Sequence, residues 1–137
     1  MSEFKSFVTV DEVETQKFDW GTLQWISEPR VTGFDRMVTG VVTLLKGQGH
    51  AKHNHPGIEE ILYILDGTGE QTIYYDDGSE EKRAVGPGQL IFLEQGQFHS
   101  TYNIAEKPLK ILAIYAKSGP EAGLRADPGC TVIPPAK

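Results

Sequence analysis

Residues 50–67, "HAKHNHPGIEEILYILDG", place three of the chain's four histidines directly before a strongly apolar run. The run follows the turn signal Pro56-Gly57 and ends at Asp66-Gly67, so it predicts a β-strand bounded by turns. His53 and His55 are two residues apart, and residues at that spacing point to the same face of a strand. The stretch therefore predicts strands whose side chains can share one metal ion.

The same alternation of short apolar segments and turn signals continues on both sides. The other strand-length segments are "TLQWI", "MVTGVVTLL", "EQTIYY", "QLIFL", "HSTYNI" and "LKILAIYA". Asp77-Gly78, between "TIYY" and "EEKRAV", predicts a tight hairpin turn. Only "TVDEVETQ", near the start, is expected to form a short helical turn. Many short strands at close spacing predict an all-β sandwich or closed barrel.

The size and charge of the chain narrow the classes of partner. The length of 137 residues indicates one domain. The formal net charge of -6 disfavours nucleic acid and anionic membranes, because both select a cationic face. The sequence has no apolar run of membrane-spanning length, and its first residues lack the apolar core of a secretory signal. Since the single Cys130 cannot form an internal disulfide, we expect a cytoplasmic protein.

The composition changes near residue 118. We expect residues 1–117 to form the barrel with its N-terminal strands. Residues 118–137 are rich in proline and glycine. They are expected to form an extended tail that packs on the barrel or on a partner subunit.

Two further residues complete a plausible ligand set. A carboxylate opens the strand after Pro56-Gly57, and His99 opens another strand after the turn "EQGQ". Three neutral imidazole nitrogens and one carboxylate oxygen suit a divalent first-row metal. Without a cluster of thiolates, a structural zinc site of the cysteine type is disfavoured. Four protein ligands on an octahedral ion leave two positions open, as catalysis requires.

The spacing of these residues resembles the first signature of the cupin superfamily. That signature has a glycine, a His-x-His pair, a glutamate a few residues later and a second glycine. Here Gly47 precedes His53 with five intervening residues, and Glu60 follows His55 after four intervening residues. Gly67 follows Glu60 after six more.

The stretch "GQLIFLEQGQFHSTYN" resembles the second cupin signature. Gly88, Gly96, His99 and Asn103 fall in register with its glycines, histidine and asparagine. Glu94 stands where the family usually has proline, a departure that affects turn geometry and not a ligand. The two signatures together cover residues 47–67 and 88–103.

The resemblance implies a single cupin domain, a double-stranded β-helix or jelly-roll barrel, with a metal held inside by His53, His55, Glu60 and His99. Nitrogen and oxygen ligands suit Mn, Fe, Co, Ni, Cu or Zn, one ion per chain. Small barrels of this family commonly pair, so a homodimer is expected.

The family hosts several chemistries, among them those of dioxygenases, decarboxylases, isomerases, lyases and cyclases. We therefore predict a metal-dependent enzyme acting on a small organic molecule, by dioxygenase or by non-redox isomerase, lyase or cyclase chemistry. Glu60 is a candidate acid or base in addition to its role as a ligand. The alternative is a non-catalytic cupin module that binds or senses a small molecule.

Some neighbouring residues allow two interpretations. Glu59 competes with Glu60, but adjacent strand residues face opposite ways, and the spacing to Gly67 selects Glu60. His50 precedes His53 by three residues, the wrong parity for the same strand face. We expect His50 on the surface or rim, with contact to a substrate as the alternative.

The strand that begins at His99 supplies the candidate pocket residues. Thr101 and Asn103 share the parity of His99, so both can point inward. Tyr102 is a further candidate. The alternative for Thr101 and Asn103 is barrel filling or hydrogen bonding to the backbone, and for Tyr102 ordinary packing.

Four residues in the N-terminal region have less specific roles. Trp20 and Trp25 are expected to pack in the core or at a subunit contact. Arg30 and Arg36 could bind a substrate carboxylate, but a surface role is the simpler interpretation.

Overall fold

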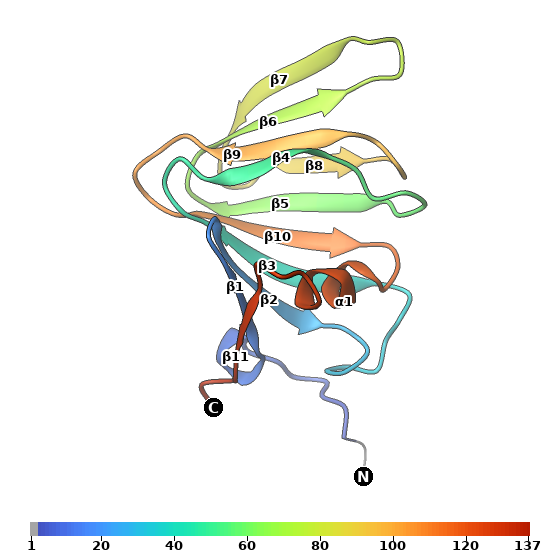
Figure 1. Ribbon diagram of the computed structural model, residues 1–137, viewed down its shortest axis with the longest axis vertical. Coiled ribbons are helices and arrows are strands. Elements are labelled where there is room, and N and C mark those ends of the chain that lie inside the picture. The colour runs from blue at the N-terminus through green and yellow to red at the C-terminus, as the bar shows by residue number, and fades with distance from the viewer. Residues whose placement is uncertain (1–2) are drawn as a thin grey trace.

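The computed structural model describes residues 3–137, which form two antiparallel β-sheets of seven and four strands (Figure 1). The larger sheet, in spatial order, consists of β11 (Thr131–Ile133), β1 (Thr15–Phe18), β2 (Gly21–Ser27), β3 (Val38–Leu44), β10 (Leu109–Tyr115), β5 (Glu60–Asp66) and β8 (Leu90–Leu93). The smaller sheet consists of β4 (Gly49–His53), β9 (His99–Asn103), β6 (Gly69–Tyr74) and β7 (Glu80–Val85). The two sheets form a jelly-roll barrel, so the prediction of a single all-β domain is confirmed.

The core lies between the two sheets. Residues alternate between buried and more exposed along β2, β3 and β10, as expected of strands with one face toward the interior. Gly40 in β3 leaves room for the indole of Trp25, because a Cβ there would lie 2.9 Å from the ring. The apolar core consists mainly of Leu23, Trp25, Val38, Val42, Leu44, Leu62, Ile64, Leu93, Leu109, Ile111 and Ala113.

The segments predicted as strands are strands in the structure. The hairpin predicted at Asp77-Gly78 joins β6 to β7, which pair from Gly69 and Val85 to Tyr74 and Glu80. Gly67, a glycine of the first signature, ends β5 with a φ of +90°, and a Cβ there would lie 2.7 Å from the Pro108 carbonyl oxygen. Glycine is therefore required by both conformation and space. The short helical turn expected near the start is η1 (Val10–Glu12).

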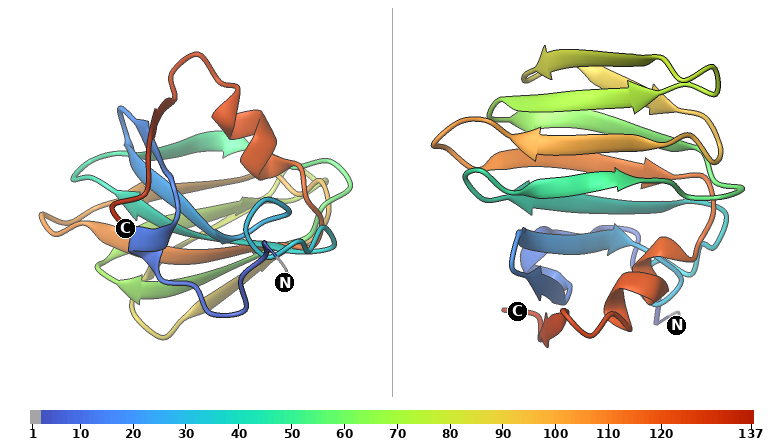
Figure 2. Two further views of the ribbon diagram at one scale, coloured as in Figure 1. Left: turned by 90° about the horizontal axis from the view of Figure 1, so that it is seen from below. Right: turned by 45° about the horizontal axis from the view of Figure 1, so that its top comes forward.

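The tail after residue 117 is not extended throughout. It contains a short helix, α1 (Pro120–Arg125), before β11 pairs antiparallel with β1. Figure 2 shows α1 and β11 at the same side of the molecule as β1 and β2. Within residues 3–137, no helix is long and apolar enough to cross a membrane.

Candidate metal centre

The three histidines come from two neighbouring segments of the smaller sheet. β4 and β9 pair so that His53 lies opposite His99. His55 lies just beyond the end of β4, where its carbonyl oxygen accepts hydrogen bonds from the backbone NH groups of Ile58 and Gly96. The prediction of His53 and His55 on one strand face is therefore modified: His53 ends the strand, and the following loop positions His55.

One ligand atom from each of His53, His55 and His99 lies within 4.8 Å of the other two. Nδ1 of His53 lies 2.7 Å from the carbonyl oxygen of Ala51, and Nδ1 of His99 lies 3.0 Å from that of Gln97. Since a carbonyl only accepts, both Nδ1 atoms carry hydrogen and donate, which leaves each Nε2 with a free lone pair. The rings are thus oriented as metal-binding histidines are.

Glu60 brings a carboxylate beside two of these histidines, His55 and His99, although it is not part of the group whose ligand atoms all lie within 4.8 Å of one another. Its Oε1 lies 3.3 Å from His99 Nε2 and 3.8 Å from His55 Nε2. Glu60 is only 4% exposed, whereas Glu59 is exposed, so the parity argument for these two residues agrees with their burial. Among the described residues, His55 Nε2 and Glu60 Oε1 are buried polar atoms without a hydrogen-bond partner. Such atoms are costly to bury, and a shared cation would satisfy both.

The electrostatics favour the protonation states that a metal requires. Burial alone would raise the pKa of Glu60, but the neighbouring His99, His55 and Tyr115 side chains hold it below its ordinary value. Burial lowers the pKa values of His53 and His55. A carboxylate and neutral imidazoles are the forms in which these groups ligate metals.

His50 lies half-buried on the same face as the other histidines, contrary to the parity argument that put it on the opposite face. An irregularity in β4 explains this difference, because His50 pairs with Thr101 while His53 pairs with His99. Three steps along β4 thus correspond to two steps along β9, as at a β-bulge. The extra residue lets His50 and His53 point to the same face. The His50 ring lies edge-on to Trp20, with ring centroids 4.4 Å apart. Burial, then the charge of His53, lowers its pKa to about 4.

A cavity of about 340 Å³ opens beside the histidines. It is lined by Trp20, Gly49, His50, Ala51, His53, His55, Tyr115 and Leu124. A smaller cavity of about 20 Å³ lies deeper, where Glu60, His99 and Thr101 join the lining. The loop histidine, the inner carboxylate and the cavity therefore form one continuous site.

Tyr115 is a site residue that the sequence analysis did not single out. It lines both cavities, and its hydroxyl interacts with Glu60. Its ring centroid lies 5.2 Å from that of His55. Burial and the nearby charge of Glu60 raise its pKa well above the ordinary value, so the phenol stays protonated. Its position at the end of a strand in an apolar segment gave no signal beyond core packing.

The candidate pocket residues of β9 divide into three cases. Thr101 lines the smaller cavity, and its hydroxyl donates to Gln71 Oε1 at 2.5 Å. Asn103 instead bonds the backbone: its amide donates to the carbonyl oxygens of Leu44 and Lys107. Tyr102 points to the opposite face, is 37% exposed and lines neither cavity. The structure thus brings only Thr101 to the site.

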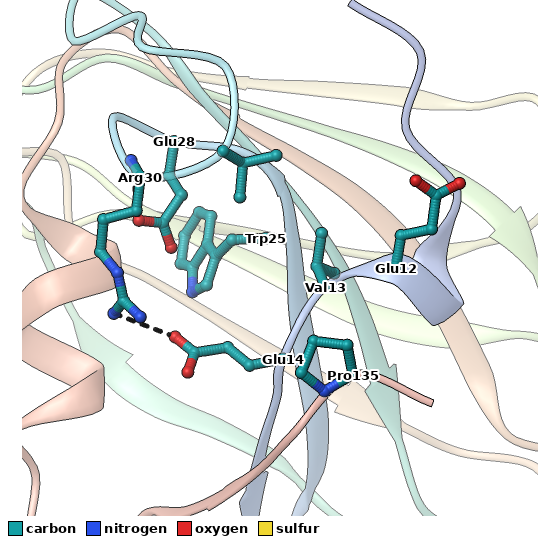
Figure 3. Close-up of a pocket in the computed structure, with 8 residues that line it drawn as sticks. Glu12, Val13, Glu14, Trp25, Glu28, Arg30 and Pro135 are labelled. Carbon is teal, nitrogen blue, oxygen red and sulfur yellow. Dashed lines mark hydrogen bonds and ion pairs between the residues drawn. The ribbon is translucent and has the colours of Figure 1, made fainter. Parts of the chain in front are cut away.

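The arginines of the N-terminal half lie away from the histidines. Arg30 lines a separate hollow of about 190 Å³, where its guanidinium lies 3.2 Å from Glu14 (Figure 3). Arg36 lies over the ring of Phe34. Neither arginine lines the cavity at the histidines. Of the two tryptophans, Trp25 belongs to the core and Trp20 lines this cavity.

The carboxylates of that hollow also hold the C-terminal helix. Nε of Arg125 in α1 donates to Glu14 Oε1 at 2.7 Å, and its Nη2 donates to Glu28 Oε2 at 2.5 Å. Glu28 is only 2% exposed. The preceding residue, Leu124, is the one that lines the cavity beside the histidines. This ion-pair cluster therefore fixes one wall of the site.

Comparisons with known proteins agree with the geometry. The family model described as "Cupin domain" matches residues 40–115. A glucose-6-phosphate isomerase from Thermococcus kodakarensis is 33% identical over 89 residues, which cover 64% of this chain and 46% of that protein. Germin-like protein 1 from Brassica napus is 29% identical over 68 residues, or 50% of this chain and 33% of that protein. The chain thus spans between a third and a half of these relatives.

Solved structures share the fold at low sequence identity. An oxalate decarboxylase from Bacillus subtilis, from a study of its Mn(II) centres, superposes with a TM-score of 0.75 at 18% identity. The match covers 88% of this chain and 32% of that one.

Proposed function

Because the chain belongs to the cupin domain family, we propose that it is a metal-dependent enzyme acting on a small organic molecule. The proposed ligands are His53, His55, Glu60 and His99. The observation that carries the proposal is that buried, unpartnered atoms of His55 and Glu60 converge with the other two imidazoles beside an open cavity. A divalent transition metal bound there supplies Lewis-acid or oxygen-activating chemistry.

The residues around the proposed ligands have separate tasks. The backbone carbonyls of Ala51 and Gln97 hold two imidazoles in the ligating tautomer. Glu60, whose pKa is held low, is the candidate base; once released from the metal, its carboxylate would accept a proton from a substrate. The protonated Tyr115 hydroxyl orients that carboxylate. The isomerase relative supports non-redox proton transfer, and dioxygenase chemistry is the alternative for the same ligand set.

The nitrogen and oxygen donor atoms favour a divalent first-row ion. The Mn(II) centres named for the oxalate decarboxylase of the same fold support manganese as the first ion to test. Fe, Co, Ni, Cu and Zn also suit nitrogen and oxygen ligands. Copper and zinc have the higher intrinsic affinity and can displace the native ion during expression.

The first test is the metal content of protein purified without a histidine tag. We expect close to one divalent transition metal per chain. Glu60→Gln should lose most of it, because the amide lacks the anionic charge of the carboxylate. Glu59→Gln is the matched control and should retain the metal, since Glu59 is exposed. Wild-type protein that neither contains nor takes up Mn, Fe, Ni or Zn contradicts the proposal.

The second test separates an enzyme from a binding or sensing module. A small-molecule extract of cells is incubated with a trace of metal-loaded protein, and mass spectrometry follows each compound over time. An enzyme consumes a compound in large molar excess, and the Glu60→Gln protein does not. A compound that is retained one to one and recovered unchanged indicates the non-catalytic alternative.

A further inference from the structure

The cavity beside the histidines has a lining without formal charge. None of the eight described residues that line it is an aspartate, glutamate, lysine or arginine. Trp20, Tyr115 and Leu124 give it large apolar surfaces. Its volume of about 340 Å³ lies at the lower end of the range for small-molecule pockets.

The nearby cations are engaged elsewhere. Arg125 follows the lining residue Leu124, but its guanidinium bonds Glu14 and Glu28. Lys52, beside the lining residue Ala51, lies over the Tyr74 ring at 4.4 Å from the centroid. An anionic group bound against this wall would lose its water without gaining a counter-charge, and burying an unpaired charge is strongly unfavourable.

The aromatic part of the wall is already ordered. Trp20 stacks on Phe18, with ring centroids 4.7 Å apart and planes within 9°. The His50 ring packs edge-on against Trp20 from β4. Among the described residues no hydrogen bond to a His50 ring nitrogen is found, so the ring can bond a ligand. A rigid apolar wall with one such group favours a ligand of matching chemistry, because little side-chain freedom is lost on binding.

From this lining we infer that the pocket takes the uncharged, mainly apolar body of a small molecule, and that His50 gives this body its hydrogen bond. The inference rests on the proposed function, since it describes the substrate class of the same site. Phosphate esters and molecules with a carboxylate on this part are poor substrates. Only the end of the substrate that faces Glu60 and the three proposed histidine ligands can be strongly polar.

The test compares benzamide, benzoate and phenyl phosphate, which share one ring and differ in charge. Binding to as-purified and to chelator-treated protein is measured by calorimetry and by quenching of tryptophan fluorescence. In the chelator-treated protein, benzamide should bind about tenfold more tightly than either anion, a difference of about 1.4 kcal/mol. Trp20→Phe should remove most of the quenching, and His50→Phe should weaken benzamide binding several-fold.

Substitution of the wall provides the matched control. Leu124→Arg adds a cation and should shift the preference about tenfold toward phenyl phosphate, whereas Leu124→Gln, polar but neutral, should not. The inference is overturned if either anion binds the unaltered chelator-treated protein as tightly as benzamide, or if benzamide does not bind. Elemental analysis of the same preparation separates the two proposals. If the protein contains metal but prefers an anion, only the inference about the substrate is overturned. If the protein takes up no metal but prefers benzamide, only the proposed metal chemistry is overturned.

Discussion

His50 shows how a single half-buried residue makes stability depend on pH. Burial and the neighbouring His53, His55 and His99 lower its pKa, while Glu60 opposes them, and the result is about 4 against an ordinary 6.5. Since the folded-state pKa is the lower one, the unfolded chain binds more protons between these values. The stability contributed by neutral His50 is therefore fully present above about pH 6.5 and is lost as the pH falls toward 4.

We expect the metal-free protein to lose stability between pH 7 and pH 4.5, and His50→Gln to reduce that loss by up to about 3 kcal/mol. Urea denaturation at several pH values in the presence of chelator measures how the free energy of unfolding of each protein changes with pH. Identical pH dependence in the two proteins would show that His50 is not held neutral by the fold.

The face on which a residue lies was predictable where the strand is regular, because side chains then alternate between the two faces without interruption. Glu60 opens β5 and Glu59 immediately precedes it, so the choice between them followed from the spacing to Gly67. His50 was misplaced because the irregularity in β4 changes the parity between it and His53. Trp20 and Tyr115 could not be assigned to the cavity, since an inward aromatic residue has the same sequence pattern whether it borders the core or a cavity.

At the scale of elements, α1 depends on one arginine. Arg125→Met leaves the carboxylate of Glu28 buried without its partner. We expect a loss of about 2–3 kcal/mol in the free energy of unfolding, as for other hydrogen bonds to buried charges. Hydrogen exchange in residues 120–125 should become faster, and benzamide should bind more weakly as Leu124 leaves the wall.

Arg83→Met is the matched control for this substitution. Arg83 pairs with Glu81, but both side chains are largely exposed, at 75% and 40%. Its loss should change stability by less than about 0.5 kcal/mol. Equal effects of the two substitutions would mean that the Arg125 cluster does not hold the helix.

The strands were predictable because each carries β-branched and aromatic residues between turn signals. Helix α1 was not, since "PEAGLR" is short and contains both proline and glycine. Tertiary contacts hold it: Gln16 Nε2 donates to the carbonyl oxygen of Glu121, and Arg125 bonds the two glutamates. Such contacts join residues about a hundred positions apart, and no local pattern reports them.

For the whole molecule, the apolar core borders the proposed metal site, since Leu44, Leu62 and Ile111 line the smaller cavity together with Glu60. The apolar cluster between the sheets contains none of the four proposed ligands. We therefore expect chelator to lower the midpoint of thermal unfolding by on the order of 10 °C while the transition stays cooperative. Calorimetry with and without chelator measures this. If the chelator-treated protein shows no cooperative transition at all, the metal is structural, and the enzyme proposal loses its main support.

The outer face of the larger sheet favours a homodimer. Leu90 and Phe92 on the edge strand β8 are 56% and 52% exposed, and Tyr63 lies beside Leu90 on β5. With Leu65, which is 43% exposed, they form an apolar patch on this face, and exposed apolar patches are where interaction sites are often found. We propose that a second copy covers this face by two-fold symmetry, because the same patch then meets itself.

We expect sedimentation at micromolar concentration to show a dimer and Phe92→Lys to shift it to monomer. Ile104→Lys is the control, because Ile104 is equally exposed but follows β9 in the other sheet. A wild-type monomer contradicts the dimer, and a Phe92→Lys protein that stays dimeric places the interface on another face.

The position of α1 on the cavity wall has a consequence for the order of synthesis. All four proposed ligands, and every other lining residue, precede residue 116, whereas Leu124 comes later in the chain. When β10 leaves the ribosome, all four proposed ligands are therefore already present and this wall is still missing. An ion can enter the nascent protein from that side before the helix docks, and the wall that selects the substrate is the last part of the site to form.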